Sequence, residues 1–157
     1  MNKKTVINIA KGRSMILVDI ENLVGSGQIT EQQVSQVRSS FMDLVKPGPR
    51  DQYFVASSHH NQLATSFGWP EGQHQYLGGE DGADYLIIKK AIDLINTANF
   101  DHVYVCSGDH SMASYVNYLQ DMGIKVTIVS LRRCISSEMR ATGAEILWLE
   151  DEYSLAA

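Results

Sequence analysis

The strongest constraint on the fold comes from one short stretch, residues 101–111. Here an apolar, β-favouring run, Val103–Cys106, is followed by Ser107–Gly108 and then at once by Asp109. A run of this length and composition is typical of a buried strand, and apolar residues then recur at helical spacing from Met112 to Leu119. The stretch therefore predicts a strand, a tight turn and a helix. It places a carboxylate at the carboxyl end of the strand, which is where parallel sheets bind ligands.

A second strand near the start of the chain ends in the same way. Met15–Val18 is an uninterrupted apolar run, the pattern of a strand buried on both faces of a parallel sheet, and Asp19 follows it directly. An aspartate in such a place can simply cap the next helix, and Asp109 taken alone fits that role. Burying an unpaired carboxylate is costly, however, so two strands that both end in aspartate favour a functional site.

The rest of the chain alternates between short apolar runs and apolar stripes at helical spacing. Thr30–Gln33 has the sequence of a capping box and predicts the start of a helix that Pro47 and Gly48 stop, while Gly123 is expected to end a later helix in a left-handed conformation. Further strands are predicted over residues 52–56, 73–77, 126–129 and 146–149, and further helices over 63–67, 84–95 and 136–141. This alternation predicts a three-layer α/β/α domain with a mainly parallel sheet of about five or six strands.

The composition fits one soluble domain with a substantial core. The chain has 157 residues, 44% of them hydrophobic, and no linker or repeat divides it, so we expect a single domain over residues 1–157 with its core at about 15–149. The net charge of -5 excludes a generally basic nucleic-acid platform, so a polyanion must be held by a local patch or through metal ions. Two cysteines predict neither a disulfide framework nor a zinc site. The chain has no membrane-length apolar run and no signal peptide, so a cytoplasmic location is expected.

A third aspartate lies in a glycine-rich acidic loop. Gly78–Asp84 opens the predicted helix over 84–95, and its last residue falls at the cap or in the first turn, where the helix dipole favours a carboxylate. If the strands that end in Asp19 and Asp109 are neighbours at a switch in strand order, their side chains converge. Converging carboxylates repel one another unless one is protonated or a cation binds, and Mg²⁺ or Mn²⁺ is the natural occupant of an all-oxygen site. Such a site suits metal-assisted hydrolysis of a phosphodiester.

These acidic segments carry a resemblance to a known family. The sequence resembles the NYN domain family, PIN-like nucleases of Rossmann-like topology. The matching segments are residues 16–23 (ILVDIENL), 82–87 (GADYLI) and 105–111 (VCSGDHS), with weaker matches at 118–126 and 137–140. Together they cover about residues 15–149, nearly the whole chain. The resemblance implies a PIN-like fold and a metal-dependent ribonuclease.

The resemblance also implies roles for individual residues. Asp19, Asp84 and Asp109 match the acids that hold the catalytic Mg²⁺ or Mn²⁺. Asn22 would support the first of these acids by hydrogen bonding, and Ser107 would support the turn around the last. The expected chemistry is attack of water on phosphorus at this aspartate cluster.

Ser111 is the departure from the family pattern. The family commonly has a fourth acid two residues after the one that Asp109 matches, and here a neutral hydroxyl stands in its place. Glu21, Glu80 and Asp81 are interpreted as solvated loop acids, although one of them could replace the missing ligand. The serine favours an alternative function, a catalytically weak or inactive PIN-like module that acts by binding RNA or protein.

Three side chains near the acids are candidates for contact with substrate. His110 lies beside Asp109, and Arg132 and Arg133 follow the predicted strand over 126–129. The arginines could touch phosphates there, although exposed charge is the usual fate of such a pair. RNA is the expected partner and a membrane is not, while a homo-oligomer or a protein partner stays open. The absence of a Gly-x-Gly-x-x-Gly or P-loop signature argues against a nucleotide-binding domain.

Overall fold

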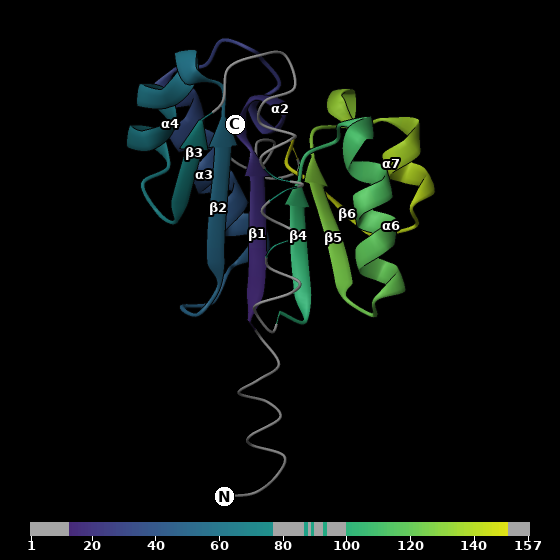
Figure 1. Ribbon diagram of the computed structural model, residues 1–157. Coiled ribbons are helices and arrows are strands. Elements are labelled where there is room, and N and C mark those ends of the chain that lie inside the picture. The colour runs from purple at the N-terminus through teal and green to yellow at the C-terminus, as the bar shows by residue number, and fades with distance from the viewer. Residues whose placement is uncertain (1–12, 77–86, 88, 90–92, 94–99, 151–157) are drawn as a thin grey trace, which may run out of the picture.

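A computed structural model describes residues 13–76, 87, 89, 93 and 100–150 of the chain. At its centre is a six-stranded, wholly parallel sheet in the order β3-β2-β1-β4-β5-β6 (Figure 1). The strands are β1 (Ser14–Asp19), β2 (Gln52–Ser57), β3 (Gln73–Tyr76), β4 (His102–Cys106), β5 (Lys125–Ser130) and β6 (Glu145–Trp148). The predicted α/β fold is therefore confirmed.

The structure describes the bounds of α2 (Ile20–Val24), α3 (Glu31–Val45), α4 (Gln62–Gly68), α6 (Ala113–Asp121) and α7 (Ser137–Ala141), with 3₁₀ turns η1 (His59–Asn61), η2 (His110–Met112) and η3 (Arg132–Cys134). Side-chain caps begin α2, α3 and α7, whereas α4 and α6 follow η1 and η2 without one. The predicted capping box is present before α3: the Thr30 hydroxyl accepts the Gln33 N–H at 3.2 Å, and the Gln33 side chain accepts the Thr30 N–H at 2.9 Å. Gly123, just after α6, has a φ of 82°, the predicted left-handed conformation.

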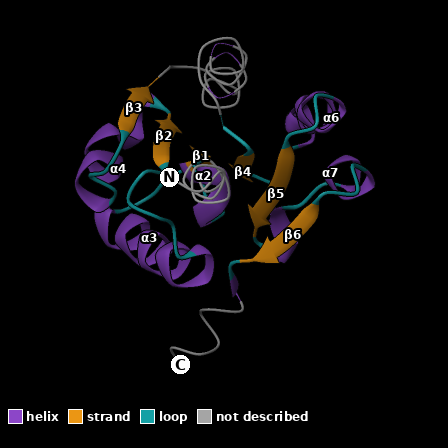
Figure 2. Ribbon diagram, turned by 90° about the horizontal axis from the view of Figure 1, so that it is seen from below, coloured by secondary structure: helices purple, strands orange, loops and turns teal. Residues whose placement is uncertain are grey.

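Helices cover both faces of the sheet and bury a separate core on each (Figure 2). Along β1 the side chains alternate, so that Met15 and Leu17 enter one core while Ile16 and Val18 enter the other. The first core is closed mainly by apolar residues of α6 and α7, and the second by those of α2 and α3. The central strand is therefore buried on both faces, which explains its unbroken apolar sequence.

The order of the strands reverses between β1 and β4. The chain adds β2 and β3 outward on one side of β1, then returns to the centre and adds β5 and β6 beyond β4 on the other side. In the parallel register Val18 lies opposite Cys106, so Asp19 and Ser107 leave the sheet side by side. The sequence-based condition that these two strands be neighbours is met, and the switch in strand order is where folds of this kind bind ligands.

One predicted element falls largely outside the described residues. Of the helix expected over 84–95, the structure describes residues 87, 89 and 93, all of which are helical, and Ile87 is fully buried in the first core. Asp84, Glu80 and Asp81 lie outside the described residues. Among the helices that are described, none combines the length and the apolar character needed to cross a membrane.

Candidate active site

Two of the predicted acids lie at the carboxyl ends of the neighbouring strands β1 and β4. Asp19 is the last residue of β1 and the N-cap of α2, and only 4% of it is exposed. Asp109 follows the turn after β4 and is the N-cap of η2, with 28% of its side chain exposed. The structure thus places one buried and one partly exposed carboxylate at the switch point of the sheet.

A single buried hydroxyl connects these two acids. Ser107 Oγ donates to Asp19 Oδ2 at 3.2 Å and accepts the backbone N–H of Asp109, also at 3.2 Å. Asp19 Oδ1 in turn accepts the Asn22 N–H at 3.5 Å, which caps α2. Ser107 therefore contacts the carboxylate of one acid and the backbone of the other, and it holds both in a fixed relation.

Asn22 contributes through its side chain at a different point from the one expected. Its Oδ1 accepts the Gly108 N–H at 2.8 Å, and its backbone N–H donates to Asp19 Oδ1 at 3.5 Å. The side chain therefore supports the turn after β4, and the backbone supports the first acid. The bond from Gly108 runs across the switch point and ties α2 to the turn that carries Asp109, whereas the bond to Asp19 is the local cap of α2.

Gly108 is required by the close approach of another segment. A Cβ at this position would lie 2.6 Å from Ile135 Cα and 2.7 Å from Ser130 Oγ, and it would also meet the backbone oxygen of Cys134. The Gly108 carbonyl accepts the N–H of Ser136, the N-cap of α7, at 2.9 Å. The turn of the site is therefore packed directly against the chain that leads into α7.

Ser111 places an unpaired oxygen beside Asp109. Its backbone N–H donates to Asp109 Oδ1 at 2.8 Å, but its Oγ is buried and has no hydrogen-bond partner in the described part of the chain. An unsatisfied buried hydroxyl costs about 1–3 kcal/mol, which a water or a cation bound at this point would relieve. The two carboxylates and this hydroxyl offer oxygen donors alone, which is the ligand chemistry that suits Mg²⁺ or Mn²⁺.

The third predicted ligand, Asp84, lies outside the described residues. Within residues 13–76 and 100–150, no three histidine, cysteine, aspartate or glutamate side chains come close enough to hold a metal ion. Asp19 and Asp109 are therefore the part of the predicted cluster that the structure places.

The predicted substrate contacts lie along the same edge of the sheet, each with partners of its own. His110 is 74% exposed, and its Nδ1 lies 3.6 Å from Asp109 Oδ1. Arg133 donates through Nη1 to the carbonyl of Gly25 at 3.0 Å, at the C-terminal end of α2, where a cation also suits the helix dipole. Arg132 Nη1 lies 3.9 Å from Glu150 Oε2. The histidine is thus exposed beside Asp109, and Arg133 has a structural partner.

The interpretation of Glu21 as a solvated loop acid is wrong. Its Oε1 accepts the Ser58 N–H at 2.7 Å and the Asn61 Nδ2–H at 2.9 Å, and Asn61 Nδ2 also reaches the carbonyl of Gly27 at 3.0 Å. Glu21 therefore joins α2, the loop that follows it and the segment after β2. The partners are almost 40 positions away in sequence, so no local pattern could have indicated them.

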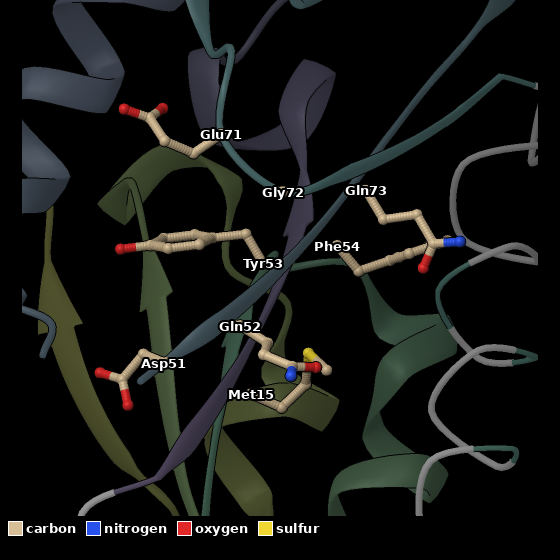
Figure 3. A pocket seen from close by; sticks show the side chains of 8 residues that line it. All are labelled: Met15, Asp51, Gln52, Tyr53, Phe54, Glu71, Gly72 and Gln73. Carbon is tan, nitrogen blue, oxygen red and sulfur yellow. The ribbon is translucent and has the colours of Figure 1, made fainter. Parts of the chain in front are cut away.

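A pocket of about 410 Å³ lies at the opposite, amino-terminal end of β1 and β2 and has the features of structural packing (Figure 3). Asp51, Tyr53 and Glu71 lie on one side of β2, whereas Phe54 and Gln73 lie on the other, so the side chains do not converge. The carboxylates are engaged as well. The Asp51 carboxylate accepts the backbone N–H groups of residues 14 and 48, each at 2.8 Å. The Glu71 carboxylate is paired with Arg38 of α3.

Comparison with known proteins agrees with this arrangement. A sequence model of the NYN domain matches residues 13–150, a range that includes Asp19, Asp84 and Asp109. No curated protein is similar enough to match the chain. Among solved structures, the chain is similar to a protein of unknown function from Vibrio parahaemolyticus, with a TM-score of 0.57 at 18% identity over 91% of this chain and 96% of that one. That likeness shows the fold alone, whereas the domain match covers nearly the whole chain. The chain therefore belongs to the NYN domain family, a family of PIN-like nucleases.

Proposed function

We propose that this protein is a ribonuclease that hydrolyses RNA phosphodiester bonds with Mg²⁺ or Mn²⁺ held by Asp19, Asp84 and Asp109. The observation that carries the proposal is the bridge through Ser107, which holds Asp19 and the backbone of Asp109 together at the switch point of the sheet. Membership of the NYN family supports nuclease chemistry. Asp84 is included among the proposed ligands because it lies in the segment 82–87 that resembles the family.

Within this proposal each side chain has a defined task. The cation, when bound, would supply Lewis-acid activation of water and neutralise charge at phosphorus. Asp19 is fixed in advance by the Ser107 hydroxyl and the Asn22 N–H, and fixed ligands need no reorganisation. Asp109 Oδ1 accepts the Ser111 N–H, and part of the Asp109 side chain stays open to solvent, from which RNA can approach.

Asp109→Asn is expected to reduce stabilisation by Mn²⁺ strongly without weakening the metal-free fold. Asparagine keeps an oxygen that can accept the Ser111 N–H and cap η2, while one of the converging negative charges is lost. In thermal melts with EDTA, the variant should unfold at or above the temperature of the wild type. At about one hundred times its Kd, Mn²⁺ should add about 2.7 kcal/mol to the wild type and much less to the variant.

Two outcomes would contradict this view. Marked destabilisation of the variant in EDTA would assign Asp109 a structural capping role. Equal stabilisation of both proteins by Mn²⁺ would mean that the metal binds elsewhere. RNA cleavage by the wild type, measured in the same buffers, then tests whether metal binding and activity go together.

The serine at position 111 favours a second candidate function, a PIN-like module that binds RNA or protein without cutting. Ser111→Asp is expected to bind Mn²⁺ about tenfold more tightly, because the added carboxylate attracts a cation a few ångströms away by about 1.4 kcal/mol. Calorimetric titration measures the Kd for Mn²⁺ directly. Ser114→Asp is the matched control, since it adds the same charge to an exposed position of α6.

The titration separates the two candidate functions. If Ser111→Asp binds no more tightly than Ser114→Asp, the Ser111 side chain does not face the cation. If Ser111→Asp binds Mn²⁺ tightly and neither it nor the wild type cuts RNA, the binding module becomes the better account of this protein.

A further inference from the structure

Two arginines stack on one tryptophan at the β6 edge of the sheet. The guanidinium carbon of Arg132, in η3, lies 4.9 Å from the centroid of the Trp148 ring, and that of Arg140, in α7, lies 5.1 Å from it. Trp148 is the last residue of β6 and is half-buried, while both arginines are exposed. We call Arg132, Trp148 and Arg140 the arginine–tryptophan cluster.

Stacking on the indole uses one flat face of each guanidinium group, and the N–H edge of Arg140 can still bind a ligand. A guanidinium presents five donors in a planar fork that matches phosphate oxygens, and a stacked fork has already lost much of its rotamer freedom. Glu150 neutralises part of the charge on Arg132, since their side chains lie 3.9 Å apart. Arg140 has no carboxylate within ion-pair range in the described part of the chain.

The cluster lies on the same edge of the sheet as the two acids. The start of α7 is tied to the turn of the site, because Ser136 N–H donates to the Gly108 carbonyl at 2.9 Å, and Arg140 follows about one helical turn later. Along the sheet, β6 is separated from β4 by β5, so the lateral distance is about 10 Å. A polyanion that reaches Asp109 can therefore extend over the cluster.

We propose that the arginine–tryptophan cluster binds single-stranded RNA beside the site of cleavage, with Arg140 on a backbone phosphate and the guanidinium planes under the bases. This inference rests on the proposed function for the identity of the ligand. Bases stack on guanidinium planes as they do on aromatic rings, which requires unpaired bases. The chain as a whole carries a net charge of -5, so attraction of a polyanion must come from a local group of cations such as this cluster.

The test measures binding of a short fluorescently labelled oligouridine by anisotropy in EDTA, where no cleavage can occur, at several salt concentrations. Arg140→Ala should weaken binding about tenfold through the loss of one stacking and phosphate contact. It should also reduce the slope of log K against log salt by about 0.7, the value for one phosphate contact on a single strand. Arg140→Lys should keep the slope and lose part of the affinity.

Arg13→Ala is the matched control. Its guanidinium also stacks on an aromatic ring, 4.8 Å from the centroid of Phe100, but it lies just before β1, at the opposite end of the sheet from the acids. This variant should bind the oligouridine like the wild type, with the same slope. Intrinsic fluorescence adds a second measurement: Trp69 is fully buried, so a change in emission on addition of RNA reports on Trp148.

Several results would overturn the inference. They are an oligouridine that does not bind the wild type, an Arg140→Ala variant that matches Arg13→Ala in affinity and slope, and an effect confined to duplex RNA. Loss of binding to phosphatidylserine vesicles in Arg140→Ala, with RNA affinity unchanged, would assign the cluster to a membrane surface instead. If Arg140→Ala loses RNA binding and the wild type cuts no RNA with Mn²⁺, the cluster stands and only the proposed catalysis fails.

Discussion

Replacing Asp19 by asparagine should abolish cleavage of RNA in Mn²⁺ and leave the fold intact. The carboxylate is 4% exposed at the end of the central strand and receives the Ser107 hydroxyl and the Asn22 N–H. Asparagine is also a good N-cap for α2, so the local structure can persist. Loss of a residue that only supports a metal ligand typically costs about 10- to 100-fold, so loss of the ligand itself should exceed about 100-fold.

The measurement is a cleavage assay on mixed RNA with Mn²⁺, run beside circular dichroism on the same samples. Asp121→Asn is the matched control, because it makes the same chemical change at an exposed position at the end of α6. Equal cleavage by the wild type and Asp19→Asn would point to a contaminating nuclease or to a site elsewhere. Loss of the helical signal in Asp19→Asn would show that the charge is needed for folding.

Gly108→Ala should cause the largest loss of stability of any single methyl addition near the site. The new Cβ would lie 2.6 Å from Ile135 Cα and 2.7 Å from Ser130 Oγ, and backbone atoms cannot move aside as the end of a long side chain can. Overpacking of this kind typically costs about 1–3 kcal/mol, and we expect the upper end of that range. The melting temperature should fall by about 6–12 °C for a chain of this length.

The effect should reach the site as well as the fold. Displacing Gly108 strains its bonds to Asn22 and Ser136, so Mn²⁺ binding should weaken along with stability. Gly27→Ala is the control, since a Cβ there meets no atom of the described residues within 4 Å and the backbone needs no positive φ. The measurement is thermal melting of the wild type, Gly108→Ala and Gly27→Ala in EDTA. Equal melting temperatures for the two variants would contradict the packing described around Gly108.

The elements of the fold could be predicted because their causes are local. The unbroken apolar run of Met15–Val18 predicts a strand buried on both faces, and the structure places it at the centre of the sheet. The capping box at Thr30 and the left-handed glycine at position 123 each depend on a few neighbouring residues. Element boundaries shifted by one or two residues, and a 3₁₀ turn precedes α6 because Asp109 caps η2 first.

The contacts within the site could not be predicted, because they depend on tertiary packing. Nothing near Asn22 in sequence indicates that its side chain would accept the N–H of Gly108, and Glu21 finds its partners beyond β2. The arginine–tryptophan cluster was missed for the same reason, since Trp148 in isolation fits an ordinary strand residue. The sequence did predict that Asp19 and Asp109 lie at the ends of strands.

The two bonds across the switch point have a consequence for how activity arises. Ser107 and Asp19 are 88 positions apart, and Gly108 and Asn22 are 86 apart. Contacts so distant form only after a long loop closes, and domains grow from the N-terminus during synthesis. A nascent chain can therefore complete β1, β2 and β3 while Asp109 has yet to reach Asp19. Any nuclease activity of this chain must then begin late in folding, after β4 pairs with β1, so that a half-made chain is harmless to the RNA around it.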